Sequence, residues 1–199
     1  MMRKGLFVTA TDTNVGKTFV SAALMRRFRG ERPMKYWKPV QTGIEVDDDT
    51  ATVERESGCG EDEIVRDGVR LARPLSPHLS ARLAGVTIEM DKLLTIFERE
   101  RPNVVEGAGG VLVPLNDQEL MIDLVAALGL PAVIVSRDAL GTINHTLLTI
   151  DALRRRGIEV AGVLMNEVPF TAAPPGNAAA IAKYGEVRVV TIDELGEFL

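Results

Sequence analysis

Cysteine, histidine and aromatic residues are scarce in this chain of 199 residues. There is one cysteine, Cys59, and there are two histidines, while aromatic residues make up 5% of the chain. A single cysteine excludes an intrachain disulfide and a metal centre built from several cysteines. No apolar run approaches the roughly 18 residues that a membrane-spanning helix requires. The first residues also lack the long apolar segment of a secretory signal, so we expect a soluble protein of the reducing cytoplasm.

An excess of positive charge is also missing. The 28 acidic residues outnumber the 23 basic residues, which gives a net charge of -5 at pH 7. This balance speaks against nucleic acid or an anionic membrane surface as the main partner. Hydrophobic residues at 46% and charged residues at 26% are close to the average of soluble globular proteins. At roughly 150 residues per domain, the length predicts one domain over residues 1–199.

Short β-branched runs alternate with helix-length segments along the chain. The strand candidates are 6–9, 34–38, 103–105, 132–135, 160–165 and 188–190. The helix candidates are 16–29, 50–57, 90–99, 120–128, 143–156 and 192–199. The segment 57–77 is rich in glycine, proline and charge, and is expected to be mostly loop. Apolar strands that alternate with helices predict an α/β fold, in which helices cover both faces of a mainly parallel sheet.

The segment from Ala10 to Thr18 lies between the first strand and the first helix. It fits the end of the phosphate-loop pattern, Gly-Lys-Ser/Thr, at Gly16, Lys17 and Thr18, while the segment opens with Ala10 and not with a glycine. Backbone N–H groups of such a loop point at phosphate oxygens, the lysine neutralises the β- and γ-phosphates, and the hydroxyl ligates magnesium. Ala10 suits this loop if its φ is negative. The alternative is an ordinary turn with a solvated lysine.

Carboxylates lie next to two other predicted elements. Glu106 ends the strand 103–105 and opens a glycine-rich turn over 106–110. Because ligands bind at the carboxyl ends of parallel strands, Glu106 suits a magnesium ligand, although a solvated glutamate in a tight turn is the alternative. Asp49 closes an acidic triplet just before a helix, where it could equally be an N-cap. The pattern does not distinguish Asp49 from Asp47 or Asp48.

Lys38 follows the second predicted strand, directly before Pro39. A lysine at this position could stabilise charge that develops on a transferred phosphoryl group, or it could be an edge lysine with its ammonium in water. Residues 141–144 begin a helix after a strand, so their free N–H groups could receive a carboxylate. His78 and His145 are isolated, and isolated histidines are more often structural than catalytic.

These motifs together resemble the dethiobiotin synthetase family. They occur in the family's order over about residues 5–170. The motifs are Thr11-Asp12-Thr13-x-Val15-Gly16-Lys17-Thr18, Lys38-Pro39-Val40-x-Thr42-Gly43, Ser76-Pro77-His78, Glu106-Gly107-Ala108-Gly109-Gly110, Gly141-x-Ile143-Asn144-His145 and Asn166. The phosphate loop alone is shared by many families, but this series is specific.

The resemblance implies a three-layer α/β fold of the P-loop NTPase type and a ligase that closes a ring by forming C–N bonds. The implied substrates are 7,8-diaminononanoate, CO2 or bicarbonate, and ATP, and the products are dethiobiotin, ADP and phosphate. The route passes through a carbamate and a carbamic–phosphoric anhydride, and it needs Mg2+ but no protein nucleophile. The family also implies a homodimer in the biotin pathway, with the diamine near the subunit interface.

The resemblance further implies a role for each matching residue. Lys38 and Lys17 are the catalytic lysines, Thr18, Asp49 and Glu106 ligate magnesium, and Asn166 binds adenine. The nucleotide-binding set is Asn14, Val15, Gly16, Lys17, Thr18, Phe19, Asp49, Glu106, Gly107, Ala108, Gly109 and Asn166. The substrate-binding set is Thr13, Thr42, Gly141, Thr142, Ile143 and Asn144, of which the last four are expected to serve the partner's site.

Two other functions are compatible with a phosphate loop. The first is a switch ATPase of the partition type, which commonly carries a second lysine near the start of the loop and a basic DNA-binding surface. Here Thr11, Asp12 and Thr13 occupy that stretch, and the net charge is negative. The second is an amide-forming synthetase of the cobyrinate type. Such enzymes normally need a glutaminase domain with a nucleophilic cysteine, for which this chain has neither the length nor a suitable cysteine.

Overall fold

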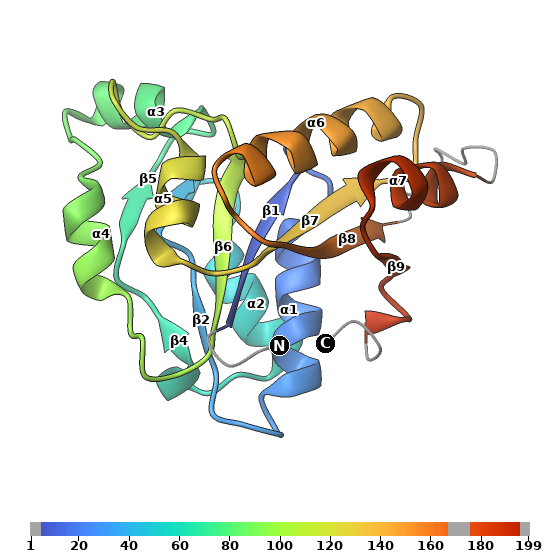
Figure 1. Ribbon diagram of the computed structural model, residues 1–199. Coiled ribbons are helices and arrows are strands. Elements are labelled where there is room, and N and C mark those ends of the chain that lie inside the picture. The colour runs from blue at the N-terminus through green and yellow to red at the C-terminus, as the bar shows by residue number, and fades with distance from the viewer. Residues whose placement is uncertain (1–4, 167–175, 196–199) are drawn as a thin grey trace.

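The computed structural model describes residues 5–166 and 176–195, and its centre is a seven-stranded sheet (Figure 1). In spatial order the strands are β4 (Ile64–Val65), β2 (Lys35–Trp37), β6 (Asn103–Gly110), β1 (Gly5–Ala10), β7 (Ala132–Arg137), β8 (Val160–Asn166) and β9 (Val189–Thr191). All neighbouring pairs in this sheet are parallel. Two short strands, β3 (Val40–Thr42) and β5 (Val69–Leu71), pair in parallel beside it.

Helices cover both faces of the sheet. They are α1 (Lys17–Phe28), α2 (Asp49–Ser57), α3 (Pro77–Ala84), α4 (Met90–Ile96), α5 (Met121–Leu128), α6 (Thr142–Arg155) and α7 (Asn177–Gly185), with one 3-10 turn, η1 (Glu61–Glu63). The wholly buried strand β1 contacts both layers: Leu6 and Val8 pack toward α1 and α2, whereas Phe7 packs toward α5 and α6. The predicted parallel α/β sheet with helices on both faces is therefore confirmed.

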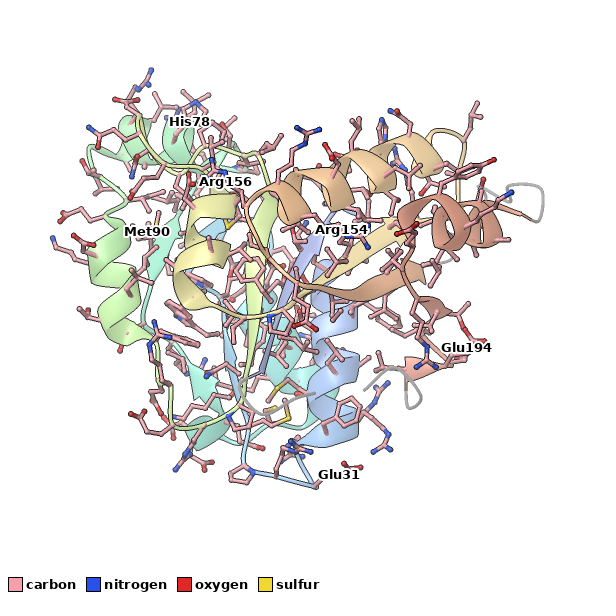
Figure 2. The ribbon with its side chains drawn as sticks, viewed as in Figure 1. Glu31, His78, Met90, Arg154, Arg156 and Glu194 are labelled. Carbon is pink, nitrogen blue, oxygen red and sulfur yellow. The ribbon has the colours of Figure 1, made fainter. Side chains whose placement is uncertain are left out.

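The last turn of α6 is tied to its neighbours by cations. Arg156, which caps the helix, pairs with the carboxylate of Asp123 on α5, and Arg154 donates to the carbonyl oxygen of Glu186 after α7 (Figure 2). These cations also lie at the negative end of the α6 dipole, as the run of three arginines predicts. None of the helices in the described residues is long and apolar enough to cross a membrane.

The expectation of mostly loop over 57–77 missed several short regular elements. The segment contains η1, β4 and β5, and α3 begins at Pro77. Strands of two or three residues are too short to show a period, so glycine and proline dominated the pattern. The helix α7 was also not anticipated. The helix expected over 90–99 ends earlier, at Ile96. Of the helix expected over 192–199, residues 192–194 form a bend and turn, while 196–199 lie outside the described residues.

The glycine-rich stretch after Glu106 was expected to be a turn, and this prediction was wrong. The strand β6 continues to Gly110, so Glu106 lies inside a strand and not at its end. A Cβ added at Gly107 would lie 2.9 Å from Cε1 of Phe7 on the neighbouring strand. The glycine therefore allows close packing of β6 against β1, which is a second use of glycine besides turns.

Candidate active site

The phosphate loop, residues 10–18, leaves β1 and enters α1. Ala10 is the buried last residue of β1, so it keeps the extended backbone that its place in the loop requires. The reversal of direction falls on Asn14, with a φ of 55°, and on Gly16, with a φ of 102°. Asparagine and glycine adopt positive φ more easily than other residues. The loop therefore turns without a glycine at position 10.

Asn166, at the end of β8, contacts this loop. Its side-chain Nδ2 donates to the carbonyl oxygen of Val15 at 3.1 Å. A Cβ added at Gly16 would lie 2.3 Å from the same nitrogen, so glycine leaves the space that Asn166 occupies. The residue expected to bind adenine therefore lies directly against the phosphate loop, and its amide also fixes the backbone of that loop.

Lys17 begins α1 and is 8% exposed. Its Nζ donates to the carbonyl oxygen of Asp12 at 3.2 Å. Burial, together with the positive charge of Lys38, lowers the pKa of Lys17 to about 8. A phosphate bound beside Lys17 would stabilise its charged form, because an anion next to a buried ammonium opposes the effect of burial.

Three oxygen-bearing side chains converge next to the loop. The hydroxyl of Thr18 lies 2.9 Å from Oδ1 of Asp49 and 3.0 Å from Oε1 of Glu106. Asp49 is the first residue of α2, and Glu106 is fully buried in β6. The acidic triplet is thereby divided: the side chain of Asp48 caps α2 by accepting from two backbone N–H groups, while Asp49 faces Thr18. This is the distinction that the sequence pattern left open.

Lys38 lies between the two carboxylates and is 3% exposed. Its Nζ is 2.5 Å from Oδ2 of Asp49 and 2.7 Å from Oε1 of Glu106, and it donates to the carbonyl oxygen of Gly107 at 3.3 Å. Burial alone would lower its pKa, but the charges of Glu106 and Asp49 outweigh burial and raise it. In turn, the positive charge of Lys38 lowers the pKa of Asp49, although burial alone would raise it. A solvated edge lysine is thus excluded.

Strand order explains why these groups meet. The strand β6 lies between β2, which leads to Lys38, and β1, which leads to the phosphate loop. Glu106 therefore projects between Lys38 and Thr18, although they are 68 and 88 residues away in the chain. Arg70, from β5, holds the strand end at Lys38 by donating to its carbonyl oxygen at 2.7 Å.

A cavity of about 910 Å³ opens beside this cluster. It is lined by Thr13, Asn14, Gly16, Lys17, Thr18, Lys38, Thr42, Gly43, Val46, Asp47, Asp49, Pro74, Leu75, Ser76, Pro77, Glu106, Ala108, Gly109 and Val113. The wall formed by Val46, Leu75, Pro77 and Val113 is apolar, and the wall at the loop is charged. Such a cavity suits a ligand with a phosphate end and an apolar end.

The apolar wall was not assigned to the site from the sequence. Half of it, Leu75 and Pro77, comes from the segment expected to be loop, where the motif Ser76-Pro77-His78 was the available signal. His78 itself lies on α3 (Figure 2) and does not line the cavity.

Several residues expected in the site do not line the cavity. Val15 is buried in the core, Phe19 is half exposed on α1, and Gly107 packs on Phe7. Residues 141–144 form the start of α6 and do not line the cavity of their own chain. Gly141 and Asn144 are exposed there, and no side chain caps the helix. The N–H of Thr142 donates to the carbonyl oxygen of Ala139 at 3.1 Å, so the N–H groups left for a ligand are those of Ile143 and Asn144.

Comparison with known proteins relates the whole chain to one group of enzymes. A family model described as an AAA domain matches residues 4–193. The ATP-dependent dethiobiotin synthetase of Paramagnetospirillum magneticum is 46% identical over 187 residues, which is 94% of this chain and 86% of the relative. The enzyme of that name from Nitrobacter hamburgensis is 48% identical over 162 residues, which is 81% of this chain and 74% of the relative.

Two solved structures share the fold. A ParA family ATPase from Chlorobium tepidum matches with a TM-score of 0.58 at 9% identity, over 96% of this chain and 84% of that one. A chain of the MinC:MinD cell division complex of Aquifex aeolicus matches with a TM-score of 0.55 at 14% identity, over 98% of this chain and 84% of that one. Identities this low show the fold alone, and they confirm the predicted three-layer fold of the P-loop NTPase type.

Proposed function

The chain belongs to the family of ATP-dependent dethiobiotin synthetases, and from this premise we propose that it converts 7,8-diaminononanoate, CO2 and ATP into dethiobiotin, ADP and phosphate. One observation carries the proposal: Lys38 is buried against Asp49 and Glu106 beside a phosphate loop, in a cavity that is also lined by apolar side chains. A phosphate-transferring site and a site for an aliphatic chain are thereby adjacent.

The proposed reaction has three steps. One amine of the substrate adds to CO2 and loses a proton, which gives a carbamate. A carbamate oxygen then attacks the γ-phosphorus of ATP and displaces ADP, which forms a carbamic–phosphoric anhydride. The second amine attacks the carbonyl carbon, loses its proton and expels phosphate, so that the cyclic urea closes. The reaction needs no protein nucleophile, since positioning and charge stabilisation are sufficient for such a phosphoryl transfer.

Lys17 and the backbone N–H groups of residues 14–19 would bind the phosphates of ATP. Lys38, already held as an ammonium by its two carboxylate partners, would stabilise the charge that develops on the transferred phosphoryl group. Asn166 would bind adenine from its position against the loop, and residues 106–109 would lie along the nucleotide. In this role the contact of Asn166 with Val15 would couple the base to the phosphate loop.

The oxygen donors of Thr18, Asp49 and Glu106 fit a magnesium site, because this ion prefers carboxylate and hydroxyl oxygens together with substrate phosphates. Bound there, the ion would neutralise phosphate charge. The described residues contain no group of three or more histidine, cysteine or acidic side chains that could hold a metal ion. That fits a metal shared with the nucleotide, for which one or two carboxylates are sufficient.

The substrate would lie with its amines near Thr13 and Thr42 and its carbon chain along Val46, Leu75 and Val113. Its carboxylate then needs a binding group at the far end. We assign this role to the start of α6, residues 141–144, of a second copy, in a homodimer whose subunits each form one domain. The exposure of Gly141 and Asn144, outside their own chain's cavity, supports this arrangement.

The product assay tests the proposal directly. The protein is incubated with 7,8-diaminononanoate, bicarbonate and Mg-ATP, and dethiobiotin and ADP are measured by mass spectrometry, with other nucleoside triphosphates in parallel. We expect both products in equal amounts. ATP hydrolysis that needs no diamine and is stimulated by DNA, without dethiobiotin, would instead favour a partition-type switch ATPase and would refute the proposal.

A further inference from the structure

Tyr36 contacts the site from the hydrophobic core. It lies in β2 with no exposed surface, and its hydroxyl donates to Oε2 of Glu106 at 3.0 Å. Parallel pairing of β2 with β6 aligns Tyr36 with Val104, two residues before Glu106. Alternate residues of a strand share a face, so Tyr36 and Glu106 project from neighbouring strands into the layer between the sheet and α1. Tyr36 does not line the cavity.

The contacts of Glu106 divide between its two oxygens. Oε1 is within hydrogen-bond distance of Thr18 and of Lys38, whereas Oε2 accepts from Tyr36. Without this hydroxyl, Oε2 would be a buried oxygen with no donor, which costs free energy and frees the carboxylate to rotate. A tyrosine hydroxyl beside a carboxylate can only donate, so Tyr36 favours one orientation of Glu106.

We propose that Tyr36 is a positioning residue that turns Oε1 of Glu106 toward the cavity and thereby tunes the affinity of the site for Mg2+. The inference rests on the proposed function, in which Glu106 holds the ion. Groups that orient a metal ligand through its other atom typically contribute about 10–100-fold to metal affinity. Tyr36 does so from the core, without touching substrate, nucleotide or ion.

The direct test compares Tyr36→Phe with Tyr184→Phe, a matched control because Tyr184 is 68% exposed on α7. Mg2+ is titrated into each protein saturated with ADP, and binding is followed by calorimetry. We expect Tyr36→Phe to weaken the apparent affinity for Mg2+ about tenfold or more, while the affinity for ADP in the presence of EDTA and the KM for the diamine are unchanged. The control should match the wild type.

Unchanged Mg2+ affinity in Tyr36→Phe, with an active wild type, would overturn the inference and leave the proposed function intact. A wild type that forms no dethiobiotin would overturn both. A second measurement does not depend on the folding of the tyrosine variant. The chain has two tyrosines, so Tyr184→Phe leaves Tyr36 as the sole one. Its ¹³Cζ NMR signal should shift when Mg2+ is added to the ADP complex, and a signal that stays in place would also overturn the inference.

Discussion

Lys17 and Lys38 bring positive charge into one site from different strand ends, but their partners differ. Lys17 contacts a backbone carbonyl, and its lowered pKa reflects burial beside another cation. Lys38 is held by two carboxylates that raise its pKa. A lysine without a carboxylate partner is suited to bind a phosphate that arrives with the substrate. A lysine held in place is suited to act on charge that appears during the reaction.

This difference predicts separable effects of two substitutions. Lys17→Ala should raise the Kd for ATP about tenfold or more, because a charge-assisted phosphate contact is lost. Lys38→Ala should lower kcat about 100-fold or more and change the Kd for ATP much less, since it removes stabilisation of the transition state. Fluorescence titration with ATP and steady-state kinetics measure the two effects. Full turnover in Lys38→Ala would contradict the assigned role.

At the same scale, some assignments could be made from the sequence and others could not. The spacing of Gly16, Lys17 and Thr18 identifies the loop because its chemistry depends on the local backbone. The choice between Asp48 and Asp49 depends instead on where α2 begins, since the first caps the helix and the second faces Thr18. Tyr36 carries no local signal at all, because its contact with Glu106 spans 70 residues.

Helices and strands likewise divide into those that the sequence predicts and those that it does not. The apolar runs that became β1, β7 and β8, and the helices α1 and α6, are long enough for periodicity to reveal them. The strands β3, β4 and β5 have two or three residues and depend on pairing with distant segments, which no local pattern records. The glycine-rich stretch 107–110 was misassigned because such a stretch favours a turn, whereas here it allows two strands to approach.

The close approach of β6 to β1 predicts a stability effect. Gly107→Ala would add a Cβ 2.9 Å from Cε1 of Phe7, and we expect this overpacking to cost about 1–3 kcal/mol of unfolding free energy in urea. Gly30→Ala is the matched control, because a Cβ there meets nothing within 4 Å. Adding Phe7→Leu to Gly107→Ala should recover part of the loss, as coupled neighbours do. Equal stability of the two alanine variants would contradict the packing argument.

At the scale of the whole molecule, the site draws on distant parts of the chain. Lys17 and Thr18 follow β1, Lys38 follows β2, and Asp49 begins α2, while Glu106 lies within β6. The order β2-β6-β1 brings these parts together at the carboxyl-terminal ends of the strands. Residues 141–144 are exposed at the start of α6, outside the cavity of their own chain. The proposed role of these residues in binding the substrate carboxylate therefore requires a second subunit, which activity measurements can test.

Complementation between two inactive variants provides that test. Lys38→Ala damages a cavity, whereas Asn144→Asp places a negative charge at the exposed helix start, where it should repel the substrate carboxylate. Each homodimer should be nearly inactive. Co-expressed with different affinity tags and purified through both, the mixed dimer combines an intact Lys38 from one subunit with an intact Asn144 from the other in one of its two sites. A two-fold dimer should then recover about half of the wild-type activity. If residues 141–144 served their own chain, both sites of the mixed dimer would carry a damaged residue, and activity would stay at the level of the homodimers.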